Sequence, residues 1–98
     1  ELSCNVMIST TSDSNAQIEV KVSSNSGGAY DVVNNINAGN NNSSSINVSV
    51  SGKTFVDVTN ASTFRVKFAT TSFGGSSYVT GDTSSNYTYF TFIRLGNT

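Results

Sequence analysis

The stretch that decides the fold is Leu2-Ser3-Cys4-Asn5-Val6-Met7-Ile8-Ser9, in which apolar and polar residues alternate. Successive side chains of a β-strand point to opposite faces, so this alternation predicts a strand with one buried face and one face toward water. The same period recurs over residues 16–23, 46–51 and 64–68. No long segment has apolar residues at helical spacing, so we expect no substantial helix. The chain is therefore predicted to be all-β.

Turn-forming residues separate the alternating segments at intervals of about 8–12 residues, which is typical of an antiparallel β-sandwich or jelly roll of seven or eight strands. Asp13-Ser14-Asn15 predicts a turn, and Gly52-Lys53 predicts a hairpin turn into a strand over residues 54–58. Residues 24–45, rich in Ser, Asn and Gly, are expected to form a soft loop region with one short strand near Tyr30–Val33. We expect a single domain over residues 1–98.

The composition predicts a thin core. Only 36% of the residues are hydrophobic and 11% are charged, against a usual charged share of about 25%. The only cysteine, Cys4, excludes an intrachain disulfide, and its place in the alternation predicts a buried small apolar side chain. A small core without stabilising disulfides is often completed by a second copy of the chain.

Charge and hydropathy exclude several classes of partner. The formal net charge is −1 and the five basic residues are scattered, so we expect no nucleic-acid partner. The apolar runs are too short to cross a bilayer, so we expect no membrane insertion. Because the chain begins at Glu1 without a leader, we expect it to be a processed or excised piece of a longer protein.

The residue types needed for common catalytic chemistry are missing. The sequence has no histidine and one cysteine, which excludes Ser-His-Asp and Cys-His arrangements and His/Cys zinc sites. We therefore predict no catalytic residues, no cofactor and no metal, and we expect that the protein is not an enzyme. Asp13 and Asp82 lie in loops with oxygen-bearing neighbours; we interpret both as turn formers, and calcium binding is the alternative.

The last predicted strand, Tyr87–Leu95, is bulky on both faces. A strand that is apolar on both faces is normally covered on both. In a small sandwich the opposing sheet covers one face, so the other needs a loop or a second subunit. We favour a subunit and predict an oligomer interface made by Tyr87, Tyr89, Phe90, Phe92 and Arg94.

Two further side chains of this region have a predicted role. Arg94 either lies at the sheet rim with its head in water or is buried against a carboxylate, for which Asp57 is the candidate. Tyr78 lies between a glycine pair and the 81–86 loop and is the candidate for a contact with a receptor.

The end of the chain resembles a known kind of domain. Thr88-Tyr89-Phe90-Thr91-Phe92-Ile93-Arg94-Leu95-Gly96-Asn97-Thr98, preceded by Phe64-Arg65-Val66-Lys67-Phe68, resembles the C-terminal signature of small surface domains of tailed phages, marine ones especially. Those domains are similar to trimeric jelly-roll knobs of the C1q and tumour-necrosis-factor type. The resemblance covers roughly residues 54–98, and Asn97 stands where those domains have an acidic residue. It implies a last strand near a threefold axis, with its aromatic residues facing neighbouring subunits.

The resemblance implies a structural role on the surface of a virion, as a tail-fibre knob or a capsid decoration protein that attaches to a host or reinforces the particle. The implied partners are copies of the chain in a homotrimer, other virion proteins, and a glycan or protein of the host surface. Two alternatives stay open. One is a subunit of a bacterial or archaeal extracellular filament that donates Glu1–Thr10 to a neighbour; the other is a carbohydrate-binding module.

Overall fold

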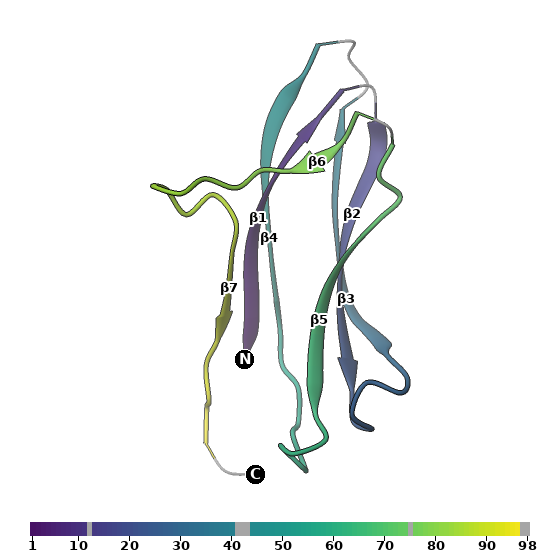
Figure 1. Cartoon of the computed structure of the whole chain (residues 1–98), viewed down its shortest axis with the longest axis vertical. Helices are drawn as coiled ribbons and strands as arrows, with labels where there is room; N and C mark the ends of the chain where they lie inside the picture. Colours follow the sequence, from purple (N-terminus) through teal and green to yellow (C-terminus); the bar gives the residue numbers. More distant parts are fainter. Residues whose placement is uncertain (12, 41–43, 75, 97–98) are drawn as a thin grey trace.

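The computed structural model describes residues 1–11, 13–40, 44–74 and 76–96. Two antiparallel sheets face each other in this part of the chain, so the predicted β-sandwich is confirmed (Figure 1). None of the described residues is helical, and so no helix there could cross a membrane. The strands are β1 Leu2–Thr10, β2 Asp13–Ser23, β3 Asp31–Asn40, β4 Ile46–Thr54, β5 Arg65–Thr71, β6 Tyr78–Val79 and β7 Tyr89–Phe92.

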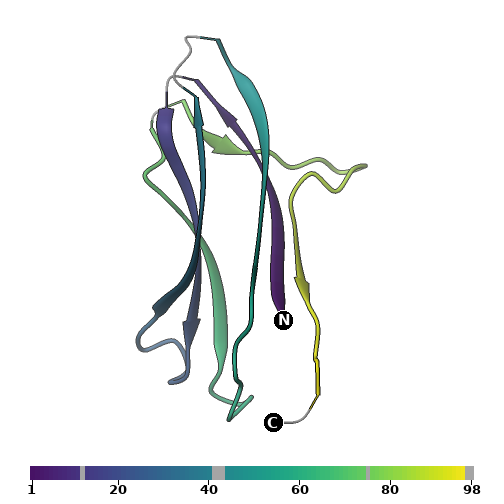
Figure 2. The ribbon, with the colours of Figure 1, turned by 180° about the vertical axis from the view of Figure 1, so that it is seen from behind.

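β1 is the central strand of the first sheet, called sheet A. β4 pairs with its whole length on one side, and on the other side β7 pairs with residues 2–5 and β6 with residues 8–9. Sheet B has the order β3-β2-β5. The connection between β6 and β7 extends away from both sheets, as the views from the two sides show (Figures 1 and 2).

The core lies between the sheets, and its residues in β1 and β2 are at inward positions that the alternation predicts, whereas its residues in β3 were not predicted. The buried apolar side chains are Leu2, Cys4, Val6 and Ile8 of β1, Ala16, Ile18 and Val20 of β2, and Ile36 and Ala38 of β3. Cys4 is therefore a buried thiol, as predicted. Burial raises the pKa of this thiol, against a smaller opposing effect of a hydrogen bond with the Gly52 backbone. The thiol form, which is a poor nucleophile, is thus favoured.

Gly52 marks a close approach of the two sheets, and the predicted hairpin turn at this position is wrong. β4 continues through Gly52 to Thr54, and residues 55–58 are not in a strand. A Cβ atom at position 52 would lie 2.3 Å from Cδ1 of Ile36 on β3. A glycine is needed at position 52 because the Ile36 side chain occupies the space that a side chain of residue 52 would fill.

The other differences concern where strands begin and end. β3 spans Asp31–Asn40, far longer than the short strand expected within residues 24–45, of which 41–43 lie outside the described residues. β2 begins at Asp13, where a turn was predicted, although its pairing with β3 is irregular between Asp13 and Ala16. β7 is shorter than the predicted strand, because the chain leaves sheet A after Phe92.

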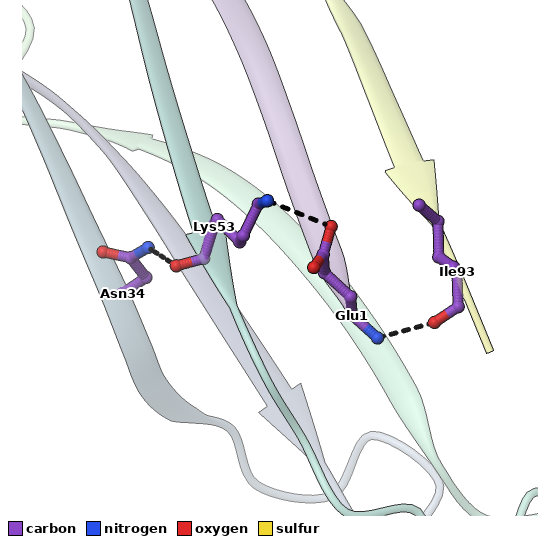
Figure 3. A network of polar contacts seen from close by, with 4 residues as sticks. All are labelled: Glu1, Asn34, Lys53 and Ile93. Carbon is purple, nitrogen blue, oxygen red and sulfur yellow. Dashed lines mark hydrogen bonds and ion pairs between the residues drawn. The ribbon is translucent and has the colours of Figure 1, made fainter. Parts of the chain in front are cut away.

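A line of polar contacts closes the β3/β4 side of the sandwich (Figure 3). Nδ2 of Asn34 on β3 donates to the carbonyl oxygen of Lys53 on β4 (3.0 Å), and Nζ of Lys53 lies 3.5 Å from Oε1 of Glu1. The amino nitrogen of Glu1 donates to the carbonyl oxygen of Ile93 (2.6 Å), and the Ile93 amide donates back to Glu1 (2.8 Å). Four segments are thus joined across both sheets at one end of the molecule.

Gly52→Ala is expected to lower the free energy of unfolding by about 1–3 kcal/mol, because the new methyl group overlaps Ile36 in a filled core. Urea unfolding measures the change. Gly81→Ala is the matched control, since a Cβ atom there meets nothing within 4 Å, and we expect a change within about 0.5 kcal/mol. An equal, small effect at both positions would contradict the close approach.

Candidate functional site

An apolar groove opens at the end of the sandwich where the chain leaves β7. Its walls are the 55–64 connection, the start of β5 and residues 92–96, and its volume is about 1030 Å³. Leu95, Phe55 and Phe92 in this groove keep 67%, 65% and 60% of their surface exposed. Exposed apolar clusters of this kind mark interaction sites in soluble proteins.

The groove exists because the two sides of the sandwich are closed differently. The Asn34–Lys53 hydrogen bond and the Gly52–Ile36 contact close the β3/β4 side. On the opposite side, β5 and β7 meet mainly through aromatic rings. Phe68 of β5 stacks on Phe90 with ring centroids 3.9 Å apart, and it meets Phe92 edge-on at 6.2 Å. The groove begins at Phe92 and continues along residues 93–96.

The structure places the five residues of the predicted interface on two different surfaces. Phe90 and Phe92 pair with Cys4 and Leu2, so they point to the core side of sheet A, where Phe68 covers part of each ring. Tyr89 pairs with Asn5 and points to the outer face. The interface itself stays a prediction, but one flat contact cannot use both surfaces.

The other two residues of the predicted interface, Arg94 and Tyr87, lie at different places. Arg94 lines the groove, and so does its candidate partner Asp57. The ion pair between them stays a prediction. Tyr87 lies just before β7, where its carbonyl oxygen accepts a hydrogen bond from Asn5 Nδ2 (3.2 Å).

Sequence reasoning missed the groove residues of the 55–64 connection. Phe55-Val56-Asp57-Val58 alternates like a strand and was therefore assigned to the second arm of a hairpin. In the structure Phe55 and Val58 project from an irregular segment into the groove.

Of the two aspartates predicted as turn formers, Asp82 has that role, whereas Asp13 lies at the start of β2 and bonds mainly to a distant segment. Oδ2 of Asp13 accepts hydrogen bonds from the Gly74 amide (2.7 Å) and from Ser77 Oγ, and its Oδ1 accepts one from the Asn15 amide (3.2 Å). Asp13 therefore ties the start of β2 to the connection between β5 and β6. Oδ1 of Asp82 accepts from the amide and the hydroxyl of Ser84, both at 2.6 Å.

These hydrogen bonds lower the pKa of both carboxyl groups. For Asp13 the largest cause is the Ser77 hydroxyl, followed by the Gly74 and Asn15 amides. For Asp82 the Ser84 hydroxyl contributes most and its amide next. No group of three or more His, Cys, Asp or Glu side chains that could hold a metal ion occurs in the part of the chain described here.

Tyr78, the candidate for a receptor contact, keeps 60% of its surface exposed. It lies in β6, paired with Ser9 on the outer face of sheet A. Its exposure is compatible with a contact, and the contact itself stays a prediction.

Asp13→Asn is expected to lower the urea concentration at the midpoint of unfolding at neutral pH. As the pH is lowered, this midpoint should also decrease less in the variant than in the wild type. The folded pKa of Asp13 is lowered, so the folded state binds fewer protons than the unfolded chain. The stabilising contribution is complete above the unfolded pKa of about 4 and is lost as the pH falls through the lower folded value. Asp31→Asn, which removes the same charge from an exposed position, is the control. An unchanged acid slope in Asp13→Asn would refute the assignment.

Comparisons of the chain with family models, curated proteins and solved structures found no match. The likeness to phage surface domains therefore rests on the residues of the sequence that carry it, above all the ending Thr88–Thr98, of which residues 97–98 lie outside the described part.

Proposed function

We propose that this chain is a non-enzymatic structural domain of a virion surface, a tail-fibre knob or a capsid decoration protein, which assembles with its own copies into a homotrimer. The apolar groove carries the assembly part of the proposal, since three of its large side chains, Phe55, Phe92 and Leu95, are more than half exposed. The virion part is supported by the resemblance of the chain's ending.

A second copy is the occupant that the groove favours. Among the described residues, nine apolar side chains form the buried core, and small cores are often completed by association. The wall of the groove carries both signs of charge, with Glu1 and Asp57 against Arg94. A neighbouring copy around a threefold axis can therefore place an opposite charge across the contact.

The groove would also give the last strand the place that the resemblance implies. Phe92 and the residues after it form one wall of the groove. Association there would bury the end of β7 between subunits, as expected for a last strand near a threefold axis. Phe90 and Phe92 would then complete an aromatic cluster that Phe68 covers only in part.

The absence of catalytic chemistry supports the structural role. The sequence has no histidine, and its one thiol is buried with a raised pKa. The carboxylate of Asp13 accepts hydrogen bonds from the connection between β5 and β6, and that of Asp82 accepts them from its own loop. General acid–base work at neutral pH usually needs groups with the opposite properties, exposed and with pKa values near 7.

The filament alternative is less well supported. β1 lies at the centre of sheet A, with partners on both sides. Donating Glu1–Thr10 to a neighbour would remove from the chain's own sandwich the strand that carries Leu2, Val6 and Ile8 into the core. Only a reciprocal exchange between copies would restore it.

Leu95→Asp is expected to convert the trimer into monomers with an unchanged circular dichroism spectrum. Losing the burial of one such side chain costs about 2 kcal/mol, which corresponds to roughly thirtyfold in a dissociation constant. Size-exclusion chromatography with light scattering over a range of concentrations measures it. Val32→Asp, at an exposed apolar position of β3 outside the groove, is the control and should stay trimeric. A wild-type chain that is monomeric at every concentration would refute the assembly.

The virion part is tested separately. Gold-labelled antibodies against the chain should bind intact particles of the virus that encodes it, as seen by electron microscopy. Label at the tips of tail fibres indicates a knob, and label over the capsid indicates a decoration protein. Particles that carry no label, with the chain detected only in soluble fractions, would contradict a virion location.

A further inference from the structure

A second hollow lies on the outer face of sheet A. It has a volume of about 340 Å³ and is lined by Ser3, Cys4, Asn5, Ser51, Gly52, Lys53 and Tyr89. We propose that this hollow binds an uncharged sugar of a host-surface glycan. The inference rests on the proposed attachment role and adds the class of ligand and the residues that contact it.

Strand register places the lining side chains in one row across three strands. Asn5 of β1 is paired with Ser51 of β4 on one side and with Tyr89 of β7 on the other. Directly paired side chains of antiparallel strands lie about 5 Å apart, so the row spans about 10 Å. That length suits one or two sugar rings lying across the strands.

The lining combines the two kinds of contact that a sugar needs. The Tyr89 ring keeps 48% of its surface exposed, which leaves an aromatic face for the C–H groups of a sugar ring. Ser3 and Ser51 offer hydroxyl groups that both donate and accept hydrogen bonds. An aromatic platform beside a few convergent polar groups is what fixes the orientation of a small ligand.

Asn5 is held in position before any ligand arrives. Its Oδ1 accepts a hydrogen bond from Ser49 Oγ (3.0 Å), and its Nδ2 donates to the Tyr87 carbonyl oxygen (3.2 Å). An amide has two N–H groups and two lone pairs on its oxygen, so one of each remains for a ligand. Pre-ordered groups bind with a smaller entropic cost.

The shape of the hollow follows from small residues at outward positions. Outward strand positions commonly carry long charged or β-branched side chains, but here the outward residues Ser3 and Ser51 are short. The floor of the hollow is therefore low, and the longer side chains of Lys53 and Tyr89 complete its lining.

Charge favours an uncharged ligand. Lys53 is the one charged residue among those that line the hollow in the described part of the chain. Its ammonium group lies 3.5 Å from the Glu1 carboxylate, which balances its charge (Figure 3). A sialylated or sulfated sugar would have to compete with that carboxylate, whereas an uncharged one would not.

A printed array of uncharged, sialylated and sulfated oligosaccharides tests the proposal, with the bound chain detected by antibody. We expect retention of uncharged oligosaccharides. The strongest of them is then titrated by saturation-transfer NMR, where Tyr89→Ala should weaken binding at least tenfold. Ser51→Gln fills the hollow from an exposed position and should weaken it similarly. Binding of sialylated or sulfated probes alone, or of none, would overturn the proposal.

Tyr30→Ala is the matched control, because Tyr30 is a partly exposed tyrosine just before β3 and outside the hollow, and it should leave binding unchanged. Tyr78→Ala tests the rival position, since Tyr78 lies on the same sheet face and is the candidate for a receptor contact. Loss of binding in Tyr78→Ala with none in Tyr89→Ala would overturn the assignment and move the site to β6. Leu95→Asp separates the two proposals. It should abolish assembly and leave the affinity of each site in the titration unchanged, since Leu95 lines the groove and not the hollow.

Discussion

The burial of one face of β1 is the constraint on which the rest of the structure depends. Val6 and Ile8 are almost fully enclosed, and they share one core with Ile18 and Val20 of the opposing sheet. The β1 backbone is paired along both sides, so β4, β6 and β7 all take their register from it. The positions of both interaction surfaces follow from that register, because each includes residues of a strand paired with β1.

The sandwich is closed by different means on its two sides, and this difference creates the groove. On one side Gly52 lets Ile36 fill the space between the sheets, and a side-chain amide bonds across them. On the other side aromatic rings span a wider gap, and part of their surface stays exposed. A chain with few large aliphatic residues fills the first gap completely and leaves the second open at one end.

The sequence predicts those features that depend on periodicity alone. The β-sandwich, the strand at Leu2–Thr10 and the buried position of Cys4 followed from alternation, because a strand with one buried face requires it. Features that depend on contacts between residues far apart in the sequence could not be predicted from alternation. Gly52 carries the local signature of a turn, and only the position of Ile36 shows why it lies within a strand. Likewise, no local pattern shows that Phe55 would lie beside the end of β7.

The pairing of β7 with β1 has a consequence for how such a domain diversifies. Along β7 the side chain of Phe90 points to the interior while that of Tyr89 points outward, and Cys4 and Asn5 of β1 divide in the same way. Exchanges at alternate positions would therefore alter what the outer surface recognises while the interior is inherited intact. Under the proposed attachment role, variants of the domain that bind different surfaces would then differ by point substitutions at every second residue of these strands, without changes in loop length.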